Sequence, residues 1–558
     1  MKRLATGAEA VGRGAAESGV SLVSGRPAST PLAQLLAATA CEGVRTERAP
    51  SERIALLSAV GASLAGARAL AVLPGLEGAA DALRAAAAAG ATGGLVALAV
   101  DDPGLALGAV RSDSRALARA LELPCVEPSD ARECLAYLAA ALELSERWST
   151  LVVLRVTARL LLEARPVEFG APAPRRAAGL RRDRARRVLV SEHGPRLAAR
   201  LQERLGQLAA EGVDSPLNRV ELRSRALGVV TSGTSYHHVR EALPEASVLK
   251  LGLSFPLPSE LVRDFTRAVD RVAVVEEMEP VLESELRAAG IPCRGKDGLP
   301  RAGELSADHV AWALSGLARP ARAAPALEPR PPEACPGCPH RALFQALKRA
   351  HVGVTADLAS AAAGVLPPQA VVDASFAPGA APALALGAAA VLGARVRGRL
   401  VALVSEGSFL HSGALTLAHA AETGEGTLVV LEDGAAPVAG ERRPDLVQLA
   451  RALGAARVRE VEVADLAGCE AALREELAAP GPSVVVARGR CPSGARCASP
   501  SRVVAERCNR CGACLRIGCP AISEDVAAML IDAQTCVACG LCAQVCRAGA
   551  IARGEERA

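Results

Sequence analysis

The chain has 558 residues, which is room for about three to four domains and excludes a single small module. Half of its residues are hydrophobic and 22% are charged, a composition typical of a folded protein with large cores. Its 64 basic and 60 acidic residues leave a net charge of +4, which favours neither nucleic acid nor an anionic membrane as a partner. The opening residues lack the apolar run of a signal peptide, and no apolar stretch reaches the roughly 18–20 residues of a membrane span. We therefore expect a soluble, cytoplasmic protein with no membrane partner.

Short apolar runs alternate with Ala-rich stretches of helical periodicity along most of the chain, which indicates parallel sheets covered by helices on both faces. Two Pro- and Ala-rich stretches, 171–187 and 317–334, are typical of linkers. The sequence therefore predicts an α/β protein with three doubly wound parallel-sheet domains, followed by a small α+β domain. The expected domains are 1–170, 186–318, 335–497 and 500–558.

The predicted strands are the apolar runs between the helical stretches. They are 70–74, 95–100, 124–127 and 151–156 in the first domain, 188–190, 227–231 and 271–275 in the second, and 370–373, 400–405, 427–432 and 483–487 in the third. Helices are expected at 236–243 and 279–289 in the second domain.

Eight of the 17 Cys residues are concentrated in the last domain, in two runs of three that are spaced two residues apart, each followed by a fourth. Three thiolates at this spacing can bind one side of a [4Fe–4S] cluster, and in two-cluster ferredoxins the fourth Cys ligates the other cluster. Zinc is the alternative, although it usually takes four ligands as two separated pairs. We assign one cluster to Cys508, Cys511, Cys514 and Cys546, and the other to Cys536, Cys539, Cys542 and Cys519.

The Cys-rich domain resembles a bacterial-type two-cluster ferredoxin with two departures. Four residues instead of three stand before Cys519, and Arg547 replaces the Pro expected after Cys546. We expect the longer spacer to distort the second cluster or make it labile. Two such clusters form a one-electron relay, so the upstream domains are expected to produce electrons.

Two predicted strands of the third domain end in residues that carry oxygen ligands. The first ends in Ser405-Glu406-Gly407, and the second ends in Asp433. Mg²⁺ prefers hard oxygen ligands together with phosphate, and open α/β sheets bind ligands at the carboxyl ends of their strands. The 25 residues between Gly407 and Asp433 resemble the spacing of the Gly-Asp-Gly and Asn signature of thiamine diphosphate enzymes. Two polar strand ends in an ordinary α/β domain remain the alternative.

A Glu stands at the start of the apolar run 51–70 in the first domain. The run Ser51-Glu52-Arg53 and the residues behind it resemble the pyrimidine-binding domain of 2-oxoacid:ferredoxin oxidoreductases. In that family a Glu at the position of Glu52 binds the aminopyrimidine ring of thiamine diphosphate, where a carboxylate is needed because a proton moves at the ring nitrogen. Alone, a Glu at a helix start is more often a surface residue favoured by the helix dipole.

Over nearly its whole length the chain resembles the alpha subunits of the indolepyruvate ferredoxin oxidoreductase family. The resemblance implies oxidative decarboxylation of an aryl 2-oxoacid with coenzyme A, thiamine diphosphate and Mg²⁺, with electrons leaving through two [4Fe–4S] clusters to ferredoxin. It also implies a smaller beta subunit as partner and a middle domain like the C-terminal domain of transketolase. The matching motifs are Cys335–Arg341, Phe409–Gly413, Asp357 with Leu366–Pro368, Asp101–Gly104, Glu127–Asp130, Arg155–Arg159, Tyr236 and Val275–Glu277.

The resemblance also supplies the candidate site residues. They are Glu52 and His411 as catalytic residues, and Glu52, Glu406, Asp433, Gly407, Ser29 and His340 as cofactor-binding residues. Cys335 and Cys338 could bind a further cluster with Cys491, although the family's fourth Cys is Ser360 here; the alternative is a pair of thiols in a Pro/Gly-rich turn.

Many departures from the family cluster at the expected active site. The family's Tyr-Pro-Gly-Thr-Pro loop is Arg26-Pro27-Ala28-Ser29-Thr30, and its Asp and Asn metal ligands are Glu406 and Asp433. The sequence therefore leaves three hypotheses: an active oxidoreductase subunit, an altered paralogue that keeps the fold and transfers electrons or acts as a scaffold, or an iron–sulfur reductase that uses another donor site.

Overall fold

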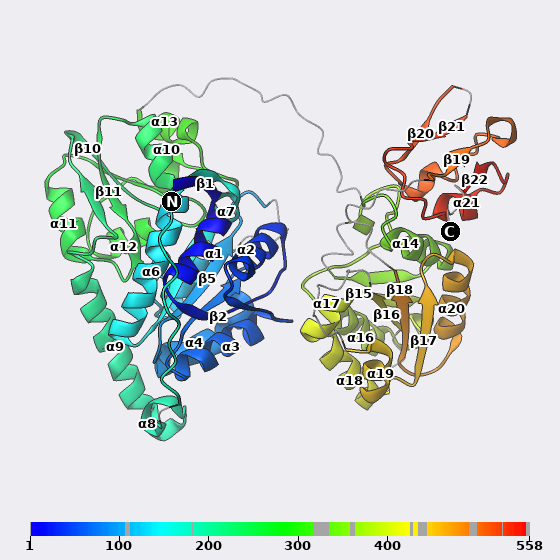
Figure 1. The fold of residues 1–558 in the computed structure, drawn as a ribbon, viewed down its shortest axis with the longest axis horizontal. Helices are drawn as coiled ribbons and strands as arrows, with labels where there is room; N and C mark the ends of the chain where they lie inside the picture. Colours follow the sequence, from blue (N-terminus) through cyan, green and yellow to red (C-terminus); the bar gives the residue numbers. More distant parts are fainter. Residues whose placement is uncertain are drawn as a thin grey trace. The chain divides into compact units, whose positions relative to one another are not determined.

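The computed structural model describes residues 2–105, 112–180, 182–315, 334–357, 363–424, 428–433, 444–489, 499–526 and 528–553. The chain divides into two compact units, Met1–Arg322 and Ala323–Ala558, which are coloured blue to green and green to red in Figure 1. Within the described ranges, every helix is too short or too polar to cross a membrane. The boundaries of the four expected domains stay predictions.

A seven-stranded sheet forms the centre of the first unit. Its elements are β1 (Lys2–Thr6), α1 (Gly7–Glu17), β2 (Val20–Gly25), α2 (Thr30–Cys41), β3 (Arg45–Arg48), α3 (Glu52–Leu64), β4 (Arg68–Leu73), α4 (Ala80–Ala89), β5 (Leu95–Asp101), α5 (Ser114–Ala120), β6 (Cys125–Val126), α6 (Ala131–Trp148), β7 (Leu151–Thr157), α7 (Ala158–Leu162), β8 (Ala164–Glu168) and β12 (Leu253–Phe255). The strand order is β12-β6-β7-β5-β4-β2-β3, and only β12 runs antiparallel to its neighbour.

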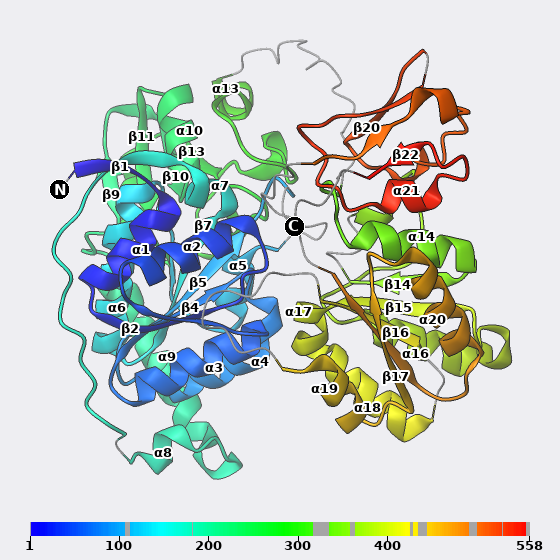
Figure 2. The same ribbon diagram turned by 45° about the vertical axis from the view of Figure 1, so that its right-hand side comes forward.

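Each face of this sheet carries its own hydrophobic core, because side chains alternate along a strand. Leu70 and Val96 share one core with α1, α2 and α6, whereas Ala71 and Ala97 share the other with α3, α4 and α5. Figure 2 shows α1 and α2 on one side of the sheet and α3 and α4 on the other. Side-chain caps fix the helix starts: Asp130, for example, accepts hydrogen bonds from two backbone amides in the first turn of α6. The doubly wound parallel sheet that the sequence predicts is therefore confirmed here.

A four-stranded sheet completes the first unit. Its elements are α8 (Arg184–Arg187), α9 (Gly194–Glu211), β9 (Arg219–Glu221), β10 (Ser224–Ser232), α10 (Ser235–Ala242), β11 (Ala246–Leu251), α11 (Ser259–Arg267), β13 (Val272–Val275), α12 (Val281–Ala288) and α13 (Ala307–Ser315). The order is β13-β10-β11-β9, with β9 antiparallel. Helices α10 and α13 cover one face, and α11 and α12 cover the other. Between β11 and α11 the chain contributes β12 to the seven-stranded sheet, so the two sheets are joined by the backbone itself.

The second unit contains a five-stranded parallel sheet in the order β14-β15-β16-β18-β17. Its elements are α14 (His340–Ala350), β14 (Gly353–Ala356), α16 (Ala381–Leu392), β15 (Leu400–Ser405), α17 (Glu406–Ser408), α18 (Ala414–Thr423), β16 (Leu428–Asp433), α19 (Leu446–Ala452), β17 (Arg457–Glu462), α20 (Leu466–Ala478) and β18 (Ser483–Arg488). Helices α16, α18 and α19 cover one face, and α14 and α20 cover the other.

The Cys-rich domain packs against the α14 and α20 layer. It consists of the antiparallel pairs β19 (Arg502–Val503) with β22 (Ile551–Ala552) and β20 (Ile522–Glu524) with β21 (Met529–Ile531), and the short helix α21 (Leu541–Val545). Its apolar residues Ile517, Met529 and Val545 belong to the same core as Phe344 of α14 and Leu473 of α20. The two domains of the second unit therefore share one hydrophobic core.

Nine of the eleven predicted strands are confirmed within one to three residues, and two are wrong. Residues 188–190 form no strand, because all three side chains are exposed and no neighbouring strand pairs with them. Residues 370–373 also form no strand. Ala370 has a positive φ of 46°, and the isolated bridge to Thr355 is made by Ala374, just after the predicted run. The link 317–334 lies outside the described residues except for its last residue.

Candidate functional site

The carboxyl ends of β14, β15 and β16 lie side by side in the second unit. Strand β15 pairs with β16 in parallel, with Ser405 opposite Glu432. Glu406 and Asp433, each one position further along, therefore follow at the same edge of the sheet. Open α/β sheets bind their ligands at this edge. The backbone thus brings the two residues predicted to bind Mg²⁺ to adjoining positions.

Asp357, at the end of β14, organises the turn that follows β15. Its carboxylate is fully buried and accepts hydrogen bonds from the backbone N (2.9 Å) and the Oγ (2.6 Å) of Ser405. Ser405 in turn precedes Glu406, the first residue of α17. Among the described residues, no atom lies within 4 Å of the position that a Cβ would take at Gly407. Ser405, where the family has Gly, therefore ties the turn to β14.

His411 lies in a single π-helical turn, Phe409–Gly413, between α17 and α18. Such turns are rare and occur often at functional sites. The Ser412 Oγ donates a hydrogen bond to the Pro378 carbonyl at 3.0 Å and lies 3.1 Å from His411 Nδ1. The π turn is thus tied to the loop before α16, and it holds His411 five residues after Glu406 in the chain.

Glu52 is the first residue of α3, where Ser51 caps the helix by accepting a hydrogen bond from the Ile54 amide. Its side chain is nearly buried, and its Oε1 accepts a hydrogen bond from Arg26 Nη1 at 3.0 Å. Gly78 lies against this carboxylate, since a Cβ there would stand 2.9 Å from Oε2. Glu52 is therefore an inward-facing carboxylate with a cationic partner and not the exposed residue of the surface alternative.

Ser29 lies in the same loop as Arg26, directly before α2. Its Oγ is buried and makes no hydrogen bond within the described part of the chain, not even the helix cap that a Ser at this position usually makes. Leaving a buried hydroxyl unpartnered costs about 1–3 kcal/mol. The Ser29 hydroxyl is thus a group that a bound molecule would satisfy.

Two cavities in the Cys-rich domain each contain one of the two predicted sets of four Cys. The first cavity is closed by Val503, Met529 and Ile551, and the second by apolar side chains that include Ile522 and Leu541. The first is lined by Cys508, Cys511, Cys514 and Cys546, and the second by Cys519, Cys536, Cys539 and Cys542.

The thiols within each cavity interact electrostatically. Burial raises the pKa of the Cys514 thiol, and the charges of Cys546 and Cys508 raise it further. In the second cavity burial raises the pKa of Cys542 to about 12, again helped by the other Cys of its set. Iron binds cysteine as the thiolate, and the positive charge of iron would offset this burial and mutual repulsion. The residues present therefore fit one cluster in each cavity.

No group of three or more His, Cys, Asp or Glu side chains within the described ranges is gathered tightly enough for a single metal ion. A four-iron cluster holds its thiolates farther apart than one ion does, so this arrangement differs from a single-ion site.

The turn before α14 faces the second Cys cavity. Pro336, Gly337 and Cys338 of this turn and Arg341 of α14 line the cavity together with its four Cys. The Cys338 Sγ lies 3.4 Å from Nδ1 of His340, the first residue of α14. Cys491 and Ser360, which the further cluster would involve, lie outside the described residues, so that cluster stays a prediction.

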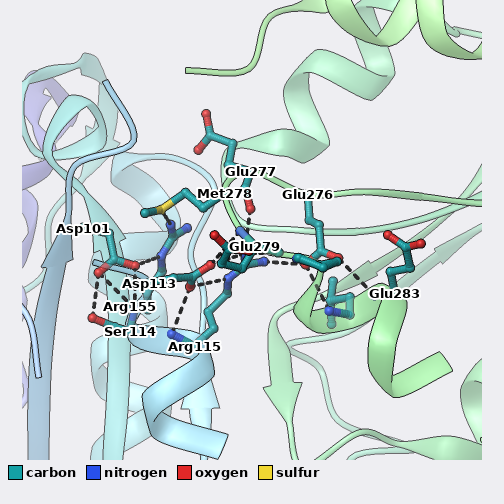
Figure 3. Close-up of polar contacts among 12 residues, drawn as sticks. Asp101, Asp113, Ser114, Arg115, Arg155, Glu276, Glu277, Met278, Glu279 and Glu283 are labelled. Atoms are coloured by element: carbon teal, nitrogen blue, oxygen red, sulfur yellow. Dashed lines mark hydrogen bonds and ion pairs between the residues drawn. The ribbon is translucent and has the colours of Figure 1, made fainter. Parts of the chain in front are cut away.

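A buried ionic network joins the two sheets of the first unit (Figure 3). Arg155 Nε donates to Asp101 Oδ2 at 2.8 Å, at the carboxyl end of the seven-stranded sheet. Arg115 binds Asp113 at 2.7 Å and Glu276 at 2.8 Å, the latter at the end of β13. Burial alone would raise the pKa of the Asp113 carboxyl, but Arg115 holds it well below its usual range. The motifs at 101–104, 155–159 and 275–277 therefore join two sheets.

A second buried cation, Lys250, joins the same two sheets. Its Nζ donates to the Ser129 Oγ at 2.9 Å and pairs with Glu133 of α6. Both Tyr residues of the chain, Tyr137 and Tyr236, place their rings near this ammonium, at 5.5 and 5.1 Å. The motifs around Ser129 and Tyr236 are thus explained by packing.

The comparisons with known proteins agree with this architecture. A family of 4Fe-4S binding domains matches residues 529–552, which include Cys536, Cys539, Cys542 and Cys546. The chain is 31% identical to the indolepyruvate oxidoreductase subunit IorA of Methanothermobacter marburgensis, over 98% of this chain and 96% of that one. It is 30% identical to the subunit of the same name from Thermococcus kodakarensis, over 97% and 96%.

Among solved structures, a 2-oxoglutarate:ferredoxin oxidoreductase from Magnetococcus marinus matches with 16% identity and a TM-score of 0.46, over 56% of this chain and 65% of that one. A split-gene transketolase matches with 16% identity and a TM-score of 0.38, over 56% and 98%.

The α/β sheets and the 4Fe-4S binding domain define an iron–sulfur protein. The identity over nearly the full length of both chains is more specific, and the chain belongs to the family of indolepyruvate oxidoreductase subunits IorA.

Proposed function

We propose that this chain is the large subunit of a 2-oxoacid:ferredoxin oxidoreductase. It converts an aryl 2-oxoacid, such as indolepyruvate, and coenzyme A into an acyl-CoA, carbon dioxide, one proton and two electrons. The electrons leave one at a time through two [4Fe–4S] clusters to ferredoxin. The observation that carries the proposal is that a chain related over its full length to indolepyruvate oxidoreductase subunits also holds two cavities with four Cys each.

Thiamine diphosphate is the proposed cofactor, and each of the two units holds candidate residues for it. When bound, it supplies the carbon nucleophile and electron sink that loss of carbon dioxide from a 2-oxoacid requires. Glu406 and Asp433 would hold the Mg²⁺ of the diphosphate, since both carry carboxylates and follow each other at adjoining strand ends. Two acidic ligands would place more negative charge near the diphosphate than the family's Asp and Asn, which the metal ion offsets.

In the first unit, Glu52 would bind the aminopyrimidine of the cofactor and hold the proton that moves there. Arg26 keeps the Glu52 carboxylate oriented by its hydrogen bond at 3.0 Å. The unpartnered Ser29 hydroxyl would donate to the substrate or cofactor. His411, held by the π turn, and His340, at the start of α14, are the candidate proton-carrying groups of the second unit.

The relatives are named subunits, and we propose a smaller beta subunit as the partner of this chain. Ferredoxin is the proposed acceptor, because each cluster passes single electrons.

Calorimetry on anaerobically purified protein tests the proposal directly. Thiamine diphosphate should bind saturably in the presence of Mg²⁺ and not in its absence. The variant Glu406→Gln, which keeps the size of the side chain and removes its charge, should weaken Mg²⁺-dependent binding. Glu422→Gln, an exposed Glu on α18, is the matched control. Absence of binding to the parent protein would refute the proposal and favour an altered paralogue that relays electrons or acts as a scaffold.

A further inference from the structure

The extra residue before Cys519 has a binding partner in the preceding domain. The spacer between Cys514 and Cys519 forms a single helical turn, Leu515–Ile517, and ends at Gly518 with φ of +65°. This turn directs the carbonyl groups of Ile517 and Gly518 away from the Cys-rich domain. Both carbonyls accept hydrogen bonds from side chains of the preceding α/β domain.

Arg341 of α14 provides the first contact. Its guanidinium is 2% exposed, and Nη1 donates to the carbonyl of Ile517 at 3.0 Å and to that of Gly518. Its Nε donates at 3.3 Å to the carbonyl of Cys335, at the start of the turn that lines the second cavity. One buried cation therefore connects the spacer to the Cys335 turn.

Gln369 provides the second contact. Its side chain is also buried, and Nε2 donates to the Ile517 carbonyl at 2.6 Å. The neighbouring Pro368 packs so closely on Gly518 that a Cβ at that Gly would stand 2.7 Å from the proline ring. Arg341, Pro368 and Gln369 together hold the spacer, and we call this contact the spacer clasp.

The two Cys cavities differ in their surroundings. The second is lined by its own four Cys, by Pro336, Gly337 and Cys338 of the turn before α14 and by Arg341 of α14, whereas the first is lined only by residues 503–551 of the Cys-rich domain. Of the two clusters, the second faces the α/β domain and the first faces away from the Cys335 turn.

We propose that the four-residue spacer is a docking element, and that the spacer clasp makes the second cluster the one that receives electrons. Each electron would first reduce the second cluster, making its charge more negative by one. It would then pass to the first cluster and leave from there to a one-electron acceptor protein. Arg341 is a positioning residue in this scheme, and its charge also stabilises the reduced and more negative form of the second cluster. The source of the electrons rests on the proposed function, but the docking and the effect on the potential do not.

The expectation that the longer spacer distorts the second cluster or makes it labile stays a prediction. The spacer is held by three hydrogen bonds from buried side chains, so the structure provides the additional residue with a function.

A redox titration of the anaerobically purified, cluster-loaded protein tests the proposal without any 2-oxoacid. Dithionite reduction followed by electron paramagnetic resonance gives the potential of each cluster. In Arg341→Gln the second cluster should become at least tenfold harder to reduce, which is 59 mV for one electron, while the first keeps its potential. Arg349→Gln, an exposed Arg on the same helix that pairs with Glu470, is the matched control and should change neither. Equal potentials in Arg341→Gln and the parent, or a shift confined to the first cluster, would overturn the proposal.

A second variant covers the case in which Arg341→Gln fails to incorporate iron. Gln369→Ala changes no charge and removes one hydrogen bond of the spacer clasp. Hydrogen exchange of the amides in residues 515–518 should become faster in this variant, while the exchange of β14 is unchanged. Exchange at the parent's rate would refute the spacer clasp. If the potentials and the exchange behave as expected but no 2-oxoacid reduces the clusters, the proposed function fails and the docking stands.

Discussion

Replacement of Arg115 by Met is the sharpest test of how the first unit is held together. Arg115, on α5, is 3% exposed, and its guanidinium binds the carboxylates of Asp113 and Glu276 and the carbonyls of Glu277 (2.6 Å) and Glu279 (3.1 Å). Met fills a similar volume but leaves two buried carboxylates without their cation. The four acceptors come from both sheets of the unit, so the contact between the sheets is weakened.

The size of the effect follows from the burial of the pair. Removing one partner of a buried ion pair costs about 3–5 kcal/mol, because the remaining charge stays uncompensated. For a large domain, each kcal/mol shifts the melting temperature by roughly 2 °C. The melting temperature of the first unit should therefore fall by about 6–10 °C.

Differential scanning calorimetry of the full chain, with the transition of the first unit identified by hydrogen exchange, measures this shift. Arg119→Met is the matched control, since Arg119 lies one turn further along α5, pairs with Glu285 across the same contact, and is half exposed. An exposed pair contributes about 0–1 kcal/mol, so this control should melt within roughly 2 °C of the parent. Equal melting of the two variants would show that the buried network adds nothing beyond a surface pair and would refute the reasoning.

Three further predictions concern the sites and the pH dependence. Glu52→Ala should abolish dye reduction by a 2-oxoacid while the visible absorbance of the clusters is unchanged, and retained activity would contradict the function proposed for this carboxylate. Cys511→Ala should halve the iron content, because the first cavity loses one of its four ligands, and full iron content would reject that ligand set. Burial lowers the pKa of Lys296 to about 8, so between pH 8 and about 10 the folded chain binds fewer protons than the unfolded chain, and stability rises with pH. Melting curves of the parent and Lys296→Met should therefore diverge over that range in favour of the parent, and parallel curves would disprove the shift.

Features that depend on local spacing could be predicted from the sequence. The two sets of Cys follow from a ligand pattern within 39 residues, and the cavities of the structure contain the same two sets. The strands that carry Glu406 and Asp433 were predicted from their apolar runs, and the parallel register then brings both residues to one edge. In each case residues close together in the sequence determine the feature, so a short segment is enough to predict it.

Contacts between distant segments could not be predicted in this way. The hydrogen bond from Arg26 to Glu52 joins residues 26 positions apart, and the contact from Arg341 to Ile517 joins residues 176 apart. Neither Arg carries a signal in its own surroundings, because a lone Arg in a loop or helix is usually solvent-exposed. The predicted strand at 188–190 is wrong for a related reason. Its apolar run is a local signal for a buried strand, but in the structure all three side chains are exposed.

The altered residues at the proposed active site differ in whether the chain itself satisfies them, and this difference bears on whether the site is in use. Ser405 replaces a family Gly and is fully paired, since its hydroxyl and amide both donate to Asp357. Arg26 replaces a family Tyr and is paired with Glu52. Ser29, in contrast, keeps a hydroxyl where the family has Thr, and its buried Oγ has no hydrogen-bond partner within the described part of the chain. A buried hydroxyl without a partner costs about 1–3 kcal/mol, and a ligand that satisfies it removes that cost, so thiamine diphosphate binding should depend on Ser29 more than on Ser405 or Arg26.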